Sequence, residues 1–334
     1  MPEMQQKCRA TLTIPIDGQG RRFGHIVLPW SRNVSGWGSL RIPVAVLGNR
    51  SGPTVLLTGG NHGDEFEGPI VLCELARTLD LSSVHGTIII LPALNYPAVK
   101  AGTRLSPIDG GNMNRSFRAR RDGTITEQIA HFVEQELISR ADAVLDFHAG
   151  GRTMLFSPFA ACHKLSNATQ TERARQALLA FGAPIGLVFE ELDAEGMLDT
   201  AVEQRGKLFL STELGGGGST SPETLSIARR GLHNFLTYAG VIDGPVKPSQ
   251  GPTRLMTNDA AGYIACEVPG LIEYTVEVGA SVARNDVIAT ITDFDRIEAP
   301  PVLVRAPIDG VLLGRLHGGL TDRGDFLALI ARDL

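Results

Sequence analysis

Two side chains that can bind a divalent metal ion stand close together in the first quarter of the chain. His62 and Glu65 lie within the segment GGNHGDEFEG, directly after the apolar run TVLLT. On the opening turn of a helix, residues three positions apart share a face, so this imidazole and this carboxylate could hold one ion together. The flanking glycines let the backbone turn sharply at the end of the apolar run. Because such a pair often arises by chance, further ligands are needed to support a metal site.

A third candidate ligand, His148, follows the apolar run AVLDF and stands just before two glycines. In open α/β sheets, ligands bind at the carboxyl ends of the strands. Two histidines and one glutamate with an open fourth position are typical of a catalytic zinc site. Asp146, two residues before His148, has two interpretations: it either orients a ligand imidazole or is a structural carboxylate.

Glu213 ends another apolar run, KLFLSTE, and is followed by LGGGG. Hydrolysis at a metal ion requires a general base that takes a proton from water. We assign this role to Glu213, because the apolar approach places its carboxylate at the same edge of the sheet as the metal ligands. The alternative is an ordinary loop carboxylate.

A glycine-rich loop over residues 102–117 carries two arginines and two asparagines. The planar guanidinium of an arginine can donate two parallel hydrogen bonds to a carboxylate, and it can also stabilise an oxyanion. Together with the three segments above, this loop would complete a hydrolytic site.

The elements that would position these residues alternate between strand and helix, which indicates an α/β fold with a largely parallel or mixed sheet. The expected strands are short and rich in β-branched residues: Thr54–Thr58, Thr87–Leu91, Ala143–Phe147 and Lys207–Thr212. The expected helices have apolar residues on one face: Glu65–Leu79, Glu127–Arg140, Thr169–Phe181 and Pro222–Tyr238.

The pattern changes after residue 242. We expect a catalytic domain over residues 1–242, which includes N-terminal strands within residues 1–50, a Pro- and Gly-rich linker over 243–253, and an all-β domain over 254–334. The last part contains a weak repeat, in which Val276–Ile291 aligns with Gly314–Ile330. This doubled pattern resembles the barrel-sandwich fold of biotinyl and lipoyl domains. Because no lysine follows Lys247, we expect a structural or lid domain rather than a cofactor carrier.

Composition excludes several classes of protein. The net charge of −5 lacks the basic excess of a nucleic-acid-binding domain. Four scattered cysteines form no disulfide framework and no thiolate zinc site. The first residues lack the apolar core of a signal peptide, and the apolar runs are far shorter than the roughly 20 residues of a membrane span. We expect a cytoplasmic protein without a nucleic-acid or membrane partner.

Taken in order, the motifs HGDE, MNR, DFH and TELG resemble those of the succinylglutamate desuccinylase/aspartoacylase family, which belongs to the zinc carboxypeptidase superfamily. The resemblance implies a carboxypeptidase-like mixed sheet flanked by helices. It implies one zinc ion per chain, with His62, Glu65 and His148 as ligands and Glu213 as the residue that activates water. By the same resemblance, Arg104 polarises the scissile carbonyl, and Asn114 and Arg115 hold the α-carboxylate of the substrate.

The family resemblance implies hydrolysis of a small N-acyl amino acid, and it makes a homo-oligomer an expectation. The signature PIDGGNMNRSF is most similar to Nα-acetyl-L-2,4-diaminobutyrate deacetylases of ectoine degradation. For their cationic substrate, acidic neighbours would come from a loop that contains Glu190, Glu191, Asp193 and Glu195, although a solvated run of charges is the simpler interpretation.

Three alternatives stay open. A desuccinylase or an aspartoacylase would need a further basic residue in its pocket, for which Arg152 is the candidate. A metallocarboxypeptidase would need an open groove for a peptide. A non-catalytic metal-binding protein would not need Glu213, because structural zinc sites use four protein ligands.

Overall fold

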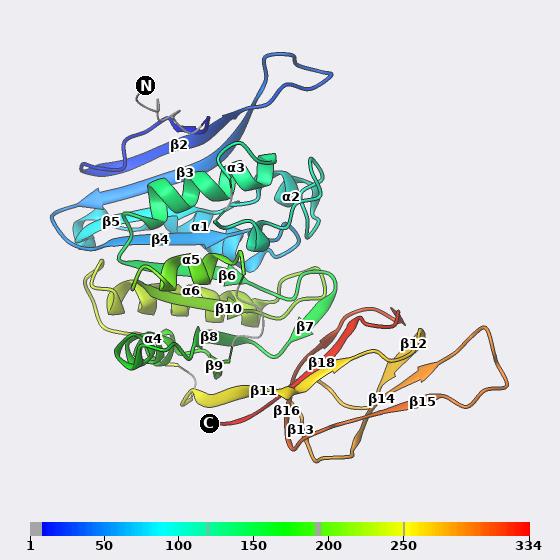
Figure 1. Cartoon of the computed structure of the whole chain (residues 1–334). Helices are drawn as coiled ribbons and strands as arrows, with labels where there is room; N and C mark the ends of the chain where they lie inside the picture. The colour runs from blue at the N-terminus through cyan, green and yellow to red at the C-terminus, as the bar shows by residue number, and fades with distance from the viewer. Residues whose placement is uncertain (1–8, 119, 191–194, 250) are drawn as a thin grey trace.

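A computed structural model of the chain describes residues 9–118, 120–190, 195–249 and 251–334. Its main sheet has 14 strands, in the order β1-β2-β3-β5-β4-β6-β10-β8-β9-β11-β18-β16-β13, with β7 paired to β16 (Figure 1). The strands of the N-terminal half are β1 (Thr11–Leu12), β2 (Gly20–Pro29), β3 (Ser39–Asn49), β4 (Thr54–Gly59), β5 (Gly86–Leu91) and β6 (Ala143–His148). They are followed by β7 (Met154–Phe156), β8 (Phe159–His163), β9 (Ile185–Phe189) and β10 (Leu208–Glu213).

The four predicted strands form the parallel centre of this sheet. Strand β4 pairs in parallel with β5 and β6, and β6 pairs in parallel with β10. Gly59 lies opposite Phe147, and Glu213 lies opposite His148. The three strands therefore end at one edge, where the segments that follow them can meet.

Helices cover both faces of the sheet because neighbouring strand residues point to opposite sides. Leu57 and Leu145 pack in one core with α1 (Glu67–Thr78), α4 (Ala168–Phe181) and α6 (Pro222–Tyr238). Leu56 and Val144 pack in the other core with α3 (Ile125–Phe132), the π-helical segment Val133–Ile138 and α5 (Leu198–Glu203). A short helix α2 (Tyr96–Ala101) follows β5. The mixed α/β fold that the sequence predicts is confirmed.

One helix begins later than the sequence pattern predicts. Helix α1 starts at Glu67, so His62 and Glu65 lie in the loop before the helix rather than on its first turn. Gly60 adopts a left-handed backbone conformation (φ 66°), which turns the chain sharply at the end of β4. The loop, rather than the helical repeat, brings these two side chains together.

The C-terminal part is all-β in the described residues 251–334, as expected. Its first strand joins the two parts of the molecule: in β11 (Arg254–Ala265), Arg254–Thr257 pairs with β9, and the strand also pairs with β18 (Phe326–Asp333). The remaining strands are β12 (Gly270–Tyr274), β13 (Ser281–Val282), β14 (Val287–Thr292), β15 (Val302–Arg305), β16 (Gly310–Leu316) and β17 (Leu320–Thr321). A separate antiparallel sheet has the order β15-β14-β12-β17. Figure 1 shows this part as a lobe at one end of the main sheet.

The sequence repeat corresponds to a repeated turn. The Asp286 carboxylate accepts a hydrogen bond from the Ala283 backbone N–H at 2.8 Å, and the Asp325 carboxylate accepts one from the Asp322 N–H at 2.8 Å. In each copy the turn joins a two-residue strand to a longer one. The repeated Asp therefore has a structural role. Among the described residues, no helix is both long and apolar enough to cross a membrane.

Candidate active site

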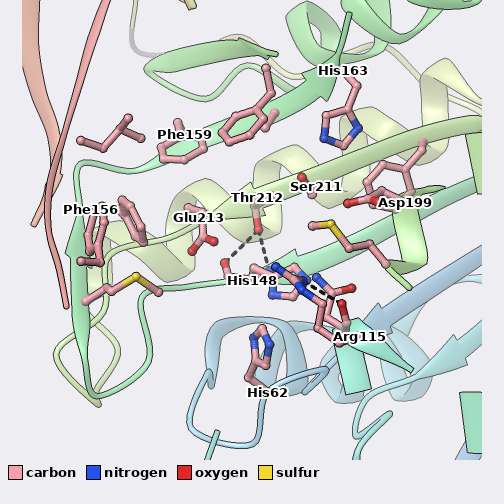
Figure 2. A pocket seen from close by; sticks show the side chains of 18 of the residues that line it. His62, Arg115, His148, Phe156, Phe159, His163, Asp199, Ser211, Thr212 and Glu213 are labelled. Atoms are coloured by element: carbon pink, nitrogen blue, oxygen red, sulfur yellow. Dashed lines mark hydrogen bonds between the residues drawn. The ribbon is translucent and has the colours of Figure 1, made fainter. Parts of the chain in front are cut away.

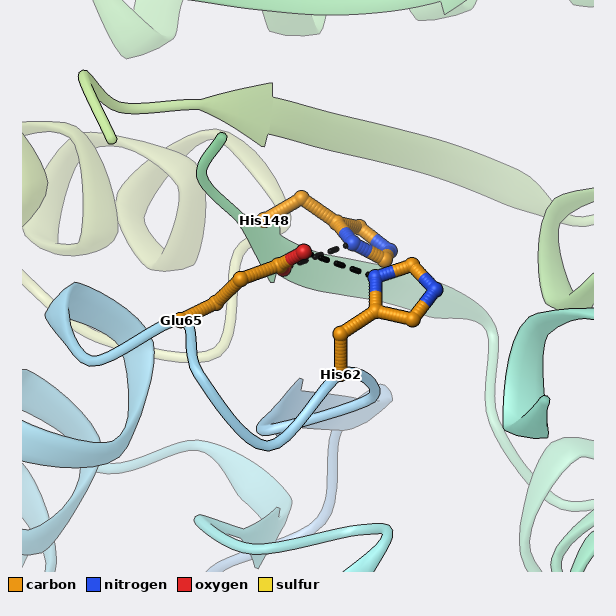
Figure 3. A group of neighbouring side chains, drawn as sticks. All are labelled: His62, Glu65 and His148. Atoms are coloured by element: carbon orange, nitrogen blue, oxygen red, sulfur yellow. Dashed lines mark hydrogen bonds and ion pairs between the residues drawn. The ribbon is translucent and has the colours of Figure 1, made fainter. Parts of the chain in front are cut away.

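The three predicted metal ligands converge in the structure. His62 Nδ1 lies 2.7 Å from Glu65 Oε1, and His148 Nδ1 lies 3.0 Å from Glu65 Oε2 (Figure 3). Ligand atoms of the three side chains all lie within 4.8 Å of one another. All three side chains are largely buried. The loop after β4 and the end of β6 thus place two imidazoles and a carboxylate around one point.

The chemistry of these groups fits a divalent cation. Burial alone would raise the pKa of Glu65, but the neighbouring His62 and His148 outweigh it and lower that pKa below its ordinary value. Burial lowers the pKa of His62, which favours the neutral imidazole that a metal ion needs. The His62 Nε2 atom is buried and has no hydrogen-bond partner among the described residues. A cation bound between the three side chains would be coordinated by ring nitrogens of the two histidines and by the carboxylate of Glu65.

Asp146 contacts the imidazole of the candidate ligand His148. Its Oδ2 atom lies 2.8 Å from His148 Nε2 and accepts a hydrogen bond from Asn61 Nδ2 at 2.9 Å. Its Oδ1 atom accepts one from the Thr58 hydroxyl at 2.6 Å. Asp146 and Glu65 raise the pKa of His148 against the effect of burial. Of the two interpretations left open by the sequence, the orienting partner is the one that this geometry favours, because such a carboxylate fixes the ring and its tautomer.

We expect Asp146→Asn to weaken metal binding by about 10- to 100-fold, because the amide orients the His148 ring less firmly and makes it a poorer donor. Titration with a competing chelator measures this affinity. Asp142→Asn is the matched control, since Asp142 precedes the same strand and bonds the Thr54 N–H at 2.8 Å, outside the site. Equal affinity of the Asp146 variant and the native protein would contradict the orienting role.

Glu213 lies beside the three ligands at the end of β10. Burial and the nearby charge of Glu65 raise the pKa of Glu213 to about 8. Its Oε2 atom is buried and has no hydrogen-bond partner among the described residues. The hydroxyl of Thr212 bonds both the backbone N–H and the carbonyl of His148, at 3.2 and 3.1 Å, which fixes the two strand ends against each other. The buried Glu213 carboxylate, with its raised pKa, can therefore exchange a proton with a reacting group.

The three candidate substrate-binding residues of the 102–117 loop lie at the same pocket as His62, His148 and Glu213. Arg104 Nη1 lies 3.7 Å from Glu65 Oε1 and remains partly exposed. Asn114 Oδ1 accepts hydrogen bonds from the Leu198 N–H at 3.1 Å and from Asn61 Nδ2 at 3.3 Å. Because this oxygen is used, the Nδ2 group of Asn114 is the part of the amide that can donate to a ligand.

A cavity of about 350 Å³ opens beside these residues (Figure 2). Its volume lies near the lower end of the roughly 300–1,000 Å³ of ligand pockets, which suits a small molecule. His62, Arg104, Asn114, Arg115, His148 and Glu213 all line it. The C-terminal strands β11 and β18 contribute Tyr263, Phe326 and Leu329 to its wall. In Figure 2, Phe156 and Phe159 lie on one side of Glu213, and Arg115 and Asp199 on the other.

Other predicted residues lie elsewhere. Arg152 is exposed, and it is absent from the described residues that line the cavity. Glu190 forms an exposed ion pair with Lys164 at 2.9 Å. Glu195 is exposed and lines a different hollow beside Arg118. Glu191 and Asp193 lie outside the described residues. None of the described members of the acidic loop therefore lines the cavity.

The cavity wall also contains polar residues to which the sequence assigned no role, and two of them can carry a charge. Asp199 and His163 both line it and are both buried. His163 Nδ1 lies 3.0 Å from Glu203 Oε1. Asp199 lies on α5, four residues after Glu195. This helix has only six residues, too few for a helical pattern that would have predicted the position of Asp199 from the sequence.

The chain is similar to proteins of one known family. The family model described as the succinylglutamate desuccinylase/aspartoacylase catalytic domain matches residues 51–239. The chain is 45% identical over 331 residues to an N-alpha-acetyl-L-2,4-diaminobutyric acid deacetylase from Halomonas elongata, covering 99% of this chain and 97% of the relative.

Two solved structures are similar over almost the whole chain. A product-bound structure of the ectoine utilization protein EutE (DoeB) from Ruegeria pomeroyi has a TM-score of 0.95 and 45% identity, and the match covers 98% of this chain and 100% of that one. A protein from Silicibacter sp. TM1040, described as a succinylglutamate desuccinylase, has a TM-score of 0.95 and 42% identity, with coverage of 98% and 100%.

Proposed function

Since the chain belongs to the succinylglutamate desuccinylase/aspartoacylase family, we propose that it is a zinc-dependent hydrolase that removes the acetyl group from Nα-acetyl-L-2,4-diaminobutyrate. The observation that carries the hydrolytic part is the convergence of His62, Glu65 and His148 beside Glu213. The buried Oε2 atom of Glu213 has no hydrogen-bond partner in the described part of the chain. The substrate is supported by the relatives that match almost the full length of the chain, one of which is a diaminobutyric acid deacetylase.

The reaction breaks the amide C–N bond and forms a C–O bond from water, and its products are acetate and L-2,4-diaminobutyrate. When bound, the zinc ion would polarise the acyl carbonyl and activate the attacking water. Glu213 accepts a proton from this water and returns it to the departing nitrogen. Arg104 donates hydrogen bonds to the carbonyl oxygen as negative charge develops on it. Asn114 and Arg115 bind the free α-carboxylate and set the position of the amide.

The wall of the cavity favours a small substrate over a peptide. Tyr263 packs edge-on against Phe326, with ring centroids 6.3 Å apart, and both rings line the cavity. These side chains come from the C-terminal strands, so the C-terminal part encloses the substrate and limits its length. An enclosed cavity disfavours a carboxypeptidase, which needs an open groove. The domain boundaries and the homo-oligomer stay predictions.

Amine release from a panel of substrates tests the proposal. The panel consists of Nα-acetyl-L-2,4-diaminobutyrate, N-acetylaspartate, N-succinylglutamate and a dipeptide, each measured with zinc-loaded protein. We expect the first compound to have the highest kcat/KM. A preference for N-succinylglutamate would move the assignment to the desuccinylases, to which the Silicibacter relative is assigned by its description. Rapid cleavage of the dipeptide would contradict the enclosed cavity.

A further inference from the structure

We propose that Asp199 binds the side-chain ammonium group of the substrate and thereby selects a cationic amino acid. This inference rests on the proposed function and adds the residue that determines specificity. In the view of Figure 2, Asp199 lies at the cavity beside Ser211, on the same side of Glu213 as Arg115. The side chain is buried, with 7% of the residue exposed.

Helix α5 and its cap hold this carboxylate in place. Asp199 is the second residue of α5, directly after Leu198. Its Oδ1 atom accepts hydrogen bonds from the backbone N–H and, at 3.0 Å, from the hydroxyl of Thr200. A carboxylate that these hydrogen bonds already hold in one position loses little conformational freedom when it binds a cation.

The same helix is tied to the residues that would hold the α-carboxylate. The Leu198 N–H donates to Asn114 Oδ1 at 3.1 Å, and the Phe117 N–H donates to the Gly196 carbonyl at 2.9 Å. These two hydrogen bonds fix the segment before Asp199 against the segment that carries Asn114 and Arg115. The substrate carries its carboxylate and its ammonium group on one short carbon skeleton. Its binding therefore requires a fixed distance between the residues that bind the carboxylate and the residue that binds the ammonium group.

Charge complementarity assigns Asp199 to the ammonium group. Among the described residues that line the cavity, the carboxylates are Asp199 and Glu213, and Glu213 serves as the general base. An ammonium group that leaves water needs an anionic partner, because an unpaired buried charge is strongly unfavourable. Arg104 and Arg115 line the cavity as well, and they would repel an ammonium group placed beside them.

Two substrates that differ only in charge test this assignment. Nα-acetyl-L-2-aminobutyrate has the same backbone and acyl group as Nα-acetyl-L-2,4-diaminobutyrate but lacks the ammonium group. We expect Asp199→Asn to lower kcat/KM for the cationic substrate by about 100-fold, mainly through KM, as is typical when one partner of a buried charge pair is removed. The value for the neutral substrate should change by less than about threefold, since that substrate makes no ion pair with this residue. Glu190→Gln, an exposed carboxylate-to-amide change nearby in the chain, is the matched control for both substrates.

The pair of substrates separates the possible failures. If Asp199 instead orients Arg115 or stabilises α5, the Asp199→Asn variant loses activity equally on both substrates, because both carry the α-carboxylate. An equal loss would overturn the inference. Unchanged kcat/KM on both substrates would overturn it too. In either case a native preference for Nα-acetyl-L-2,4-diaminobutyrate leaves the proposed function intact. Native protein that hydrolyses neither substrate but accepts an acidic one would overturn the proposed function and the inference together.

Discussion

Glu213→Gln is expected to lower kcat by about two to four orders of magnitude, the range that positioned general acid–base catalysis contributes. The amide has nearly the same shape as the carboxyl group but cannot accept a proton from water. Because Glu213 does not belong to the cluster of His62, Glu65 and His148, the zinc content of the variant should stay at the native level. Steady-state kinetics and metal analysis on the same preparation measure both quantities.

The pH profile provides a second measurement for this variant. Burial raises the pKa of Glu213 to about 8, and a bound zinc ion beside the carboxylate lowers this value by favouring the charged form. A base must be ionised to act, so kcat/KM of the native protein falls as the pH drops through this pKa. The Glu213→Gln variant should lack that acidic limb.

The matched control for Glu213→Gln is Glu223→Gln, an exposed glutamate on the first turn of α6. We expect native kcat and the native pH profile from this control. A Glu213→Gln variant that retains more than about a tenth of native kcat would contradict the role of Glu213, because general-base catalysis is worth at least about 100-fold. Loss of zinc from this variant would assign the residue to the metal site instead.

His148→Ala and His62→Ala should each abolish both zinc binding and turnover. Each change removes one of three protein ligands, and catalytic zinc sites have no spare ligand. In His148→Ala, Asp146 also loses the imidazole that lies 2.8 Å from its carboxylate. We expect zinc content to fall from about one ion per chain to near zero after desalting, with elemental analysis as the measurement.

His233→Ala is the control for these two variants, because His233 lies on α6 and contacts the Pro245 carbonyl at 3.2 Å, away from the cavity. Circular dichroism of all three variants separates loss of metal from loss of fold. If His62→Ala or His148→Ala keeps native zinc content while turnover persists, the ligand assignment is wrong.

The parts of the fold nearest the chemistry were predictable from sequence because their strands are buried on both faces. Apolar runs mark β4, β6 and β10; His148 and Glu213 are the last residues of β6 and β10, and His62 lies in the loop after β4. Parallel pairing then places Glu213 opposite His148 without any further information. The loop geometry was less accessible, since the helix α1 begins two residues after Glu65 and a left-handed Gly60 sets the turn.

The far wall of the cavity could not be predicted from local pattern. Strand β8 has the sequence FAACH, with two alanines and no β-branched residue, so its propensity for strand is weak. Strand β11 pairs with β9, although the two strands are far apart in the sequence. This pairing depends on tertiary packing. Tyr263 and Phe326 reach the cavity only through this pairing, and Asp199 reaches it through a six-residue helix. Long-range contacts of this kind leave no periodic signal in the sequence.

The most direct test of the central claim is a zinc titration of metal-free protein with Nα-acetyl-L-2,4-diaminobutyrate as substrate. We expect no turnover without metal, and a rate of acetate release that rises in proportion to added zinc until about one ion per chain is bound. Full turnover in the metal-free protein would contradict the metal-dependent mechanism. A protein that binds zinc at His62, Glu65 and His148 but never releases acetate from this compound would contradict the substrate.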